Sequence, residues 1–123
     1  MKVNAAFVFD FERLEVYQKA VEFTNEVFKT TLDYQRDIQY SLGDQFRRAA
    51  LSICNNIAEG SRKLGRSKVQ FYNYALDSAR ECIPMISISH CQSQINSEKV
   101  THLREQCVQI TRMLYRLADS VQN

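Results

Sequence analysis

The sequence predicts an all-α protein, an antiparallel up-down-up-down bundle of four helices. Three observations support this fold class. The 123 residues contain only three glycines and one proline, so the chain has few places to turn. Apolar residues recur every three or four positions along four long segments, as they do on the buried faces of helices. The length and the hydrophobic fraction of 45% are those of one soluble domain, so we expect residues 1–123 to form a single four-helix-bundle domain.

The first expected helix spans about residues 11–32, with Asp10 as its N-cap. Its apolar residues form two stripes at helical spacing rather than one. The first stripe contains Leu14, Tyr17, Val21, Thr24 and Phe28, and the second contains Val16, Ala20, Phe23 and Val27. One stripe can face the bundle core, and the other then needs a broad core or a neighbouring subunit. We take the second stripe as the candidate interface of a homo-oligomer.

The second expected helix spans about residues 42–59. Ser41 and Asp44 resemble a capping box at its start, and Gly60 is placed to end it just beyond the C-cap. One face of this helix is apolar and is formed by Leu42, Phe46, Ala49, Ala50, Ile53 and Ile57. The opposite face contains Arg48, Ser52, Asn55 and Glu59. The helix is therefore expected to pack on one side and to present polar side chains on the other.

The third expected helix spans about residues 68–93 and is apolar around most of its circumference. Ser67 and Gln70 resemble another capping box at its start. Pro84 lies inside the helix on its polar strip, where the unbonded carbonyl can take water. We therefore expect a bend near Pro84 rather than a break.

The fourth expected helix spans about residues 98–121, with Asn96 or Ser97 as its N-cap. It has one clean apolar stripe, formed by Val100, Leu103, Cys107, Ile110, Leu114, Leu117 and Val121. Because the joints between the four helices are short, neighbouring helices are expected to run antiparallel.

The charge balance is far from that of a dedicated nucleic-acid-binding protein, because sixteen Lys and Arg residues against fourteen Asp and Glu residues give a net charge of +2. Basic residues nevertheless gather near the joint between the second and third helices. The candidate contacts to RNA or DNA are Arg47, Arg62, Lys63, Arg66 and Lys68. The alternative is that this joint is basic only because it is solvated. Repetition around a ring of subunits would strengthen a weak basic site.

Neither catalysis nor a metal site is predicted. The sequence contains no glycine-rich phosphate loop, no H-E-x-x-H and no G-x-S-x-G, and we expect His90 to be half-buried with its hydrogen bonds satisfied. The four cysteines, which are Cys54, Cys82, Cys91 and Cys107, are expected to be reduced and mostly buried. A zinc site made by Cys91, Cys107, His90 and His102 is the alternative, but their spacing does not resemble a zinc ligand pair. We therefore expect no catalytic residue, metal or cofactor.

The apolar runs of the chain are only a few residues long. Asp10 and Glu12 interrupt the N-terminal segment before a signal-peptide core forms. We therefore expect a cytoplasmic protein with no membrane partner.

The second expected helix carries the most specific pattern of the chain, Gln45-x-x-Arg48-Ala49-Ala50-x-Ser52-Ile53-x-x-Asn56-Ile57-Ala58-Glu59-Gly60. With FERLEVYQKAVEF before it and Ser67-Lys68-x-x-Phe71 and DSAREC after it, this pattern resembles the four-helix-bundle proteins of the 23S rRNA intervening-sequence family, over about residues 11–121. The resemblance implies a bacterial four-helix bundle that assembles as a ring-like homopentamer, and it implies no activity. Asp77, Tyr72, Tyr74 and Pro84 depart from the family's usual pattern, so the packing of the third helix and the oligomer geometry are expected to differ in detail.

A similarity at the level of fold alone connects the chain to the accessory variability-determinant proteins of diversity-generating retroelements. Those proteins form pentameric barrels and are associated with nucleic acid, which favours RNA or DNA as a candidate partner of this chain without assigning any residue.

The structural motif of the second helix comprises Arg48, Ser52, Asn55, Asn56, Glu59 and Gly60. We expect Arg48, Asn56 and Glu59 to set the orientation of helices or subunits rather than to bind a ligand. The sequence thus predicts a non-enzymatic, self-assembling bundle with RNA, DNA or a protein as its candidate partner. The alternative is a purely structural or protein-interaction scaffold with no nucleic-acid role.

Overall fold

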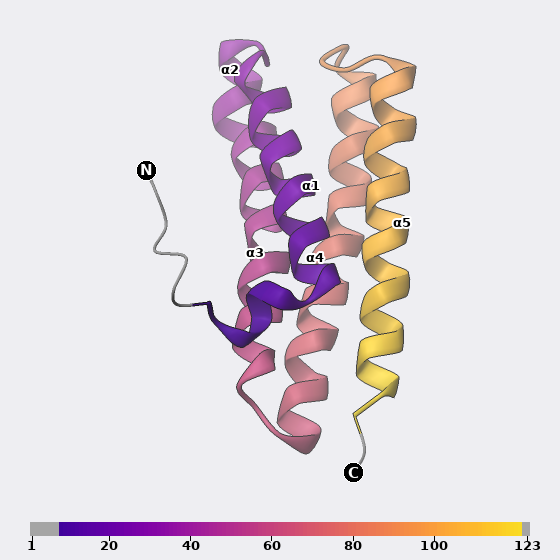
Figure 1. The fold of residues 1–123 in the computed structure, drawn as a ribbon. Coiled ribbons are helices and arrows are strands. Elements are labelled where there is room, and N and C mark those ends of the chain that lie inside the picture. Colours follow the sequence, from indigo (N-terminus) through magenta and orange to yellow (C-terminus); the bar gives the residue numbers. More distant parts are fainter. Residues whose placement is uncertain (1–7, 122–123) are drawn as a thin grey trace.

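The computed structural model describes residues 8–121, and within them the chain forms helices and no strand (Figure 1). The long helices are α1 (Glu15–Leu32), α3 (Asp44–Ser61), α4 (Gly65–Cys91) and α5 (Ser97–Asp119). The 3₁₀ turn η1 (Asp10–Arg13) precedes α1, and α2 (Arg36–Ile38) and the π-helical turn η2 (Gln39–Gly43) connect α1 to α3. Within residues 8–121, no helix combines the length and the apolar composition needed to cross a membrane.

The four long helices pack as a bundle in which α1 contacts α3 and α5, and α4 contacts α3 and α5. Figure 1 shows the chain reversing direction at each connection between long helices. The α3–α4 connection therefore lies at one end of the molecule, and the α1–α3 and α4–α5 connections lie at the other. This arrangement decides which loop residues can act together.

The core lies between the four long helices, and each of them contributes fully buried side chains. The largest apolar and aromatic ones are Phe23 and Val27 from α1, Phe46, Ile53 and Ile57 from α3, Tyr72 and Ile86 from α4, and Leu103, Ile110 and Leu114 from α5. Burial of one such side chain stabilises the fold by about 1.5–3 kcal/mol. The apolar faces predicted for the second and fourth helices are the ones that supply these residues.

The second apolar stripe of α1 belongs to this core and is not an oligomer interface. Val16 is 4% exposed, and Ala20, Phe23 and Val27 are fully buried. The Phe23 ring lies 6.4 Å from the Phe46 ring of α3, measured between centroids. A side chain buried within one chain offers no surface to a neighbouring subunit. The prediction was wrong because helical spacing does not say which of two adjacent stripes points inward.

The N-caps predicted at Asp10, Ser41 and Ser67 are also wrong. The N-cap position of α1 is occupied by Leu14, whose backbone is extended, and Asp10 instead begins the separate turn η1. Ser41 does not start a helix, because the chain is already helical before it. Its hydroxyl donates back to the carbonyl of Asp37 at 3.0 Å, as serines inside helices do.

Gly60 lies inside α3, one residue before its end at Ser61, and does not act as a terminating residue. A Cβ atom at this position would lie 3.0 Å from Cβ of Phe71 and 3.0 Å from Cε1 of Tyr72. The absence of a side chain therefore lets α4 approach α3 closely. Ser67 is likewise not a cap, because α4 already begins at Gly65.

The cap at the start of α5, after the α4–α5 connection, follows the prediction. Asn96 caps α5, and its side chain accepts a hydrogen bond from the backbone N–H of Lys99 at 2.8 Å. The helix α4 runs through Pro84, which is exposed, and ends at Cys91, two residues earlier than expected. The bend at Pro84 stays a prediction.

Candidate nucleic-acid interface

The α3–α4 connection is short and strongly turned. Only residues 62–64 separate the two helices, and the N–H of Lys63 donates to the carbonyl of Gly60 at 3.0 Å. Gly65 has a φ of 54°, in the left-handed region that favours glycine. The connection between α3 and α4 lies at one end of the bundle (Figure 1). Arg62 and Lys63 belong to it, and Arg66 and Lys68 lie in the first turn of α4.

The two lysines of this group are engaged within the chain. Nζ of Lys63 lies 3.3 Å from a carboxylate oxygen of Glu59 and 5.5 Å from the centre of the Phe71 ring. Nζ of Lys68 donates to the carbonyl of Ser61 at 3.0 Å, at the C-terminal end of α3, where a positive charge is favourable. Both lysines therefore stabilise the connection, and these contacts reduce their capacity to bind an external phosphate.

The two arginines of the group remain available. Arg62 and Arg66 are exposed, and neither forms a hydrogen bond or ion pair with any residue between 8 and 121. Arg62 is the first residue after α3, and Arg66 lies in the first turn of α4. These two guanidinium groups are the part of the predicted basic site that can bind phosphate without breaking an existing contact.

Arg47 does not belong to this interface. It lies in the first turn of α3, and the axial distance to Arg62 at the other end of the helix is about 22 Å. Its guanidinium donates to Oγ1 of Thr31 at 2.8 Å, to the carbonyl of Gln39 at 3.1 Å and to a carboxylate oxygen of Asp44 at 3.3 Å. The side chain is only 17% exposed, so Arg47 joins α3 to the end of α1 and is a wrong assignment as a nucleic-acid contact.

The structural motif of α3 forms one polar link between helices. The amide of Asn56 donates to the carbonyl of Ser52 at 2.9 Å and contacts its hydroxyl at 3.0 Å, and that hydroxyl accepts from Ser78 of α4 at 2.8 Å. Glu59 pairs only with Lys63, which follows it in the chain, and Arg48 has no partner within residues 8–121. Asn56 thus acts between helices through Ser52, whereas the expected helix-to-helix contacts of Arg48 and Glu59 do not form in the single chain.

A pocket of about 490 Å³ lies between the N-terminal turn and the last two turns of α3. One side is aromatic, because the rings of Phe9 and Phe11 stack at 5.7 Å with 19° between their planes. The other side is polar, and the full lining is Phe9, Asp10, Phe11, Asn55, Ala58, Glu59, Ser61 and Arg62. Only the aromatic FVFDF segment could have indicated this pocket from the sequence, because η1 is too short to show a period.

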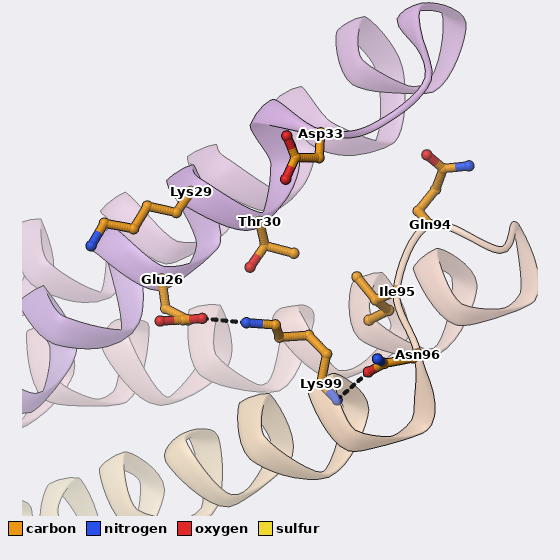
Figure 2. Close-up of a pocket in the computed structure, with 8 residues that line it drawn as sticks. All are labelled: Glu26, Lys29, Thr30, Asp33, Gln94, Ile95, Asn96 and Lys99. Atoms are coloured by element: carbon orange, nitrogen blue, oxygen red, sulfur yellow. Dashed lines mark hydrogen bonds and ion pairs between the residues drawn. The ribbon is translucent and has the colours of Figure 1, made fainter.

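A second pocket, of about 430 Å³, lies at the opposite end of the bundle, between the last turns of α1 and the α4–α5 connection (Figure 2). Figure 2 shows the carboxylate of Glu26 paired with Nζ of Lys99, while the amine of Lys29 points away from Lys99. Hydrogen bonding to Lys99 lowers the pKa of Glu26. The Glu26–Lys99 ion pair joins α1 to α5 across this pocket, and Lys29 and Asp33 are the other charged residues of its lining.

The first apolar stripe of α1 reaches the surface towards the C-terminal end of the helix, whereas Leu14, Tyr17 and Val21 are partly buried against the core. We define the α1 stripe as Leu14, Tyr17, Val21, Phe28 and Leu32. Phe28 is 39% exposed and Leu32 is 71% exposed, and Leu51 on the neighbouring α3 is 41% exposed. Thr24, at the same spacing, is buried, and its hydroxyl donates to the carbonyl of Ala20 at 2.7 Å. The α1–α3 side of the bundle therefore carries apolar surface that the single chain leaves uncovered.

The thiols and imidazoles do not form a common site among the described residues. Cys54, Cys82 and Cys107 are buried and Cys91 is exposed. Nδ1 of His90 lies 3.0 Å from the carbonyl of Ile95, and the residue is exposed rather than half-buried as predicted. Within residues 8–121, no group of three His, Cys, Asp or Glu side chains could hold a metal ion.

The other shifted pKa values follow from packing. Burial raises the pKa of Tyr34, Tyr72 and Cys54. The neighbouring Cys107 thiol, together with burial, raises the pKa of Cys82. These groups lie in the bundle interior and are not arranged as paired acid and base in a cleft.

Comparisons with known proteins agree with this architecture. A model of the family described as 23S rRNA-intervening sequence protein matches residues 12–116. A crystal structure of a protein of unknown function from the S23 ribosomal protein family of Bacteroides thetaiotaomicron has the same fold, with a TM-score of 0.77 at 20% identity, over 85% of this chain and 96% of that chain. The chain is also 31% identical over 118 residues to beta-soluble NSF attachment protein of Bos taurus. That match covers 89% of this chain but only 39% of the bovine protein.

Proposed function

Because the chain belongs to the 23S rRNA-intervening sequence protein family, we propose that it is a non-enzymatic, self-assembling protein of the bacterial cytoplasm. In this proposal residues 1–123 form one domain, the four helices pack antiparallel, and the copies assemble into a ring-like homopentamer. The ring presents its α3–α4 connections to RNA or DNA.

The observation that carries self-assembly is the α1 stripe. Phe28 and Leu32 are exposed on the same side of the bundle as Leu51 of α3. Covering one such side chain stabilises a contact by up to about 1.5–3 kcal/mol. A contiguous apolar face of this kind marks an interaction surface more often than a solvated one.

A second apolar surface gives the α1 stripe a counterpart. Tyr74 and Ile88 of α4 are 43% and 47% exposed, and Met85 lies between them at helical spacing. Helical periodicity places these residues on the α3–α4 side of the bundle, next to the α1–α3 side. Two adjacent sides of a four-helix bundle face directions about 90° apart, and a head-to-tail contact between them closes into a ring of roughly four or five copies.

The test of self-assembly exchanges apolar side chains for charged ones on two surfaces. Phe28→Glu places a charge in the proposed contact and should release single chains of 14.3 kDa. Val108→Glu is the matched control, because Val108 is 42% exposed on α5, outside the proposed contact. Sedimentation velocity should show dissociation for the first variant alone. If the two variants sediment alike, the assignment of this interface is refuted.

Arg62 and Arg66 support the nucleic-acid part of the proposal. A ring repeats the pair in every copy at one end of the bundles, so weak phosphate contacts act together. Retardation of a structured RNA at low salt should be strong for the wild type and weak for the double variant Arg62→Gln and Arg66→Gln. The exposed pair Arg104 and Arg112 on α5, changed to Gln in the same way, provides a control with equal loss of charge.

The alternative function is a scaffold that binds only protein. It is favoured by the intramolecular contacts of Arg47, Lys63 and Lys68, which leave fewer free cations than the sequence predicts. The match to an attachment protein of Bos taurus supports the same alternative. Absence of any RNA or DNA retardation at low salt would favour the scaffold, because electrostatic binding is strongest there.

A further inference from the structure

We propose that the end of the bundle at the α3–α4 connection contains a binding site for a small carboxylic acid with an apolar tail, such as a medium-chain fatty acid. The site is a pocket of about 480 Å³, within the roughly 300–1,000 Å³ of small-molecule sites. Residues of η1, α3, α4 and α5 line it together. Figure 1 shows that the C-terminal end of α5 lies at the same end of the bundle as the α3–α4 connection. This inference is independent of the proposed function.

The apolar part of this pocket is formed by four aliphatic side chains, which are Leu14, Leu64, Leu117 and Val121. Leu14 and Leu117 pack against the core, so their positions are fixed by the fold. Leu64 lies in the connection between α3 and α4 and is 85% exposed. The single chain therefore gains little from its apolar surface, whereas a ligand that covers this surface is stabilised by its burial. These side chains suit the apolar tail of the ligand.

The lining also contains a buried phenol without a partner. Tyr72 is 2% exposed, and its hydroxyl forms no hydrogen bond with any residue between 8 and 121. Burial raises the pKa of Tyr72, so the hydroxyl keeps its proton at neutral pH and remains a donor. The ring is held against α3, because a Cβ at Gly60 would lie 3.0 Å from its Cε1 atom. Since buried hydroxyls normally have a partner, we expect the ligand to supply an acceptor here.

The charge of this acceptor follows from Lys68, which also lines the pocket. Its Nζ atom lies 5.8 Å from the centre of the Tyr72 ring and donates to the carbonyl of Ser61 at 3.0 Å. The ammonium group has further hydrogens to donate, and it forms no ion pair within residues 8–121. Asp10, the acidic residue of the described lining, is exposed and is not paired with Lys68. A carboxylate is therefore the acceptor that suits both Lys68 and Tyr72.

Isothermal titration calorimetry with octanoate, octanol and acetate tests the site. Octanoate has the charged head and the apolar tail, octanol lacks the charge, and acetate lacks the tail. For the wild type we expect octanoate to bind about 10- to 150-fold more tightly than octanol, which is the contribution of a charged hydrogen bond. Acetate should bind more weakly than octanoate, because it covers none of the aliphatic lining. If octanoate binds no more tightly than either of the other two probes, the proposal is overturned.

Two variants with matched controls locate the binding. Tyr72→Phe removes the hydroxyl, keeps the ring against Gly60, and should weaken octanoate binding about 2- to 10-fold. Lys68→Met removes the charge and should bring the affinity for octanoate down to that for octanol, which should bind this variant as it binds the wild type. Tyr115→Phe on α5 and Lys29→Met on α1 remove the same groups from exposed positions, and both should bind octanoate like the wild type.

The stability of the ligand-free protein separates binding from a structural role of the hydroxyl. Tyr72→Phe should leave the urea midpoint unchanged, because no hydrogen bond within the chain is lost. A lower midpoint would show that the hydroxyl has a partner inside the protein, and it would contradict the proposal. Octanoate binding that survives both Tyr72→Phe and Lys68→Met also overturns it, because the ligand then binds elsewhere. Self-assembly and RNA retardation are measured separately, so a failure here leaves the proposed function standing.

Discussion

Replacing Gly60 by alanine tests whether the close approach of α3 and α4 decides which residue can occupy this position. The new Cβ would lie 3.0 Å from Cβ of Phe71 and from Cε1 of Tyr72, closer than side-chain carbons normally approach. Cβ of Phe71 is fixed to the backbone of α4, so relief requires the two helices to move apart. This strain is the cost of the substitution.

Two opposing effects set the magnitude. Overpacking of a tight contact costs about 1–3 kcal/mol. Alanine inside a helix is more favourable than glycine by about 0.5–1 kcal/mol. The net expectation for Gly60→Ala is therefore a loss of about 0–2.5 kcal/mol in the free energy of unfolding, centred on about 1 kcal/mol. Gly60→Asn should cost at least about 1 kcal/mol more, because the longer side chain cannot be placed between the helices.

Urea unfolding at one fixed protein concentration measures these changes, because assembly also stabilises the folded chain. Gly43→Ala is the control, since a Cβ there would lie 3.2 Å from the end of the Arg47 side chain and at ordinary contact distance, 3.5 Å and 3.6 Å, from the Ile38 carbonyl and the Tyr34 ring. It should change the unfolding free energy by less than about 0.5 kcal/mol. If Gly60→Asn proves more stable than Gly60→Ala, Gly60 acts as a C-cap in the left-handed region, where asparagine is tolerated, and the packing explanation is refuted.

Three further predictions concern single side chains. Arg47→Gln removes the charged donor from Thr31 and should lower the free energy of unfolding by about 1.5–3 kcal/mol, with unchanged RNA retardation. The hydrogen bond from Lys99 lowers the pKa of Glu26 from its ordinary value of 4.5. As the pH falls, Glu26 is therefore protonated in the unfolded chain before it is protonated in the folded chain. Above that ordinary value, the Glu26–Lys99 pair contributes its full stabilisation of the folded chain. It is lost as the pH falls through the folded-state pKa, and the urea midpoints of Glu26→Gln and wild type should converge there. At neutral pH a thiol reagent should label Cys91 in the folded protein and the three buried thiols only after unfolding.

The helices and most of the core could be predicted because burial imposes a period on the sequence. The faces that contain Phe46 and Ile53 in α3, and Leu103 and Ile110 in α5, are apolar on one side only, so their direction is unambiguous. The helix α1 carries two stripes of equal period. Which one faces inward depends on where Phe46 lies, and that is a property of the neighbouring helix rather than of α1.

The helix ends and the candidate site were harder to predict because the same residue serves different physical purposes. A glycine at the end of an apolar segment can terminate a helix, but Gly60 instead allows close contact with Tyr72. A basic residue can face solvent, as Arg62 does, or turn inward to bind three oxygen atoms, as Arg47 does. The residue type is the same in both outcomes, and tertiary contacts separate them.

The mass of the native assembly tests self-assembly most directly. Native mass spectrometry of the wild-type protein should show a dominant species of five chains, about 72 kDa, which is five times the 14.3 kDa of one chain. Phe28→Glu should shift that species to single chains, and Val108→Glu should not. A wild-type protein that remains at 14.3 kDa at every concentration would contradict the proposal that the α1 stripe is a contact between copies.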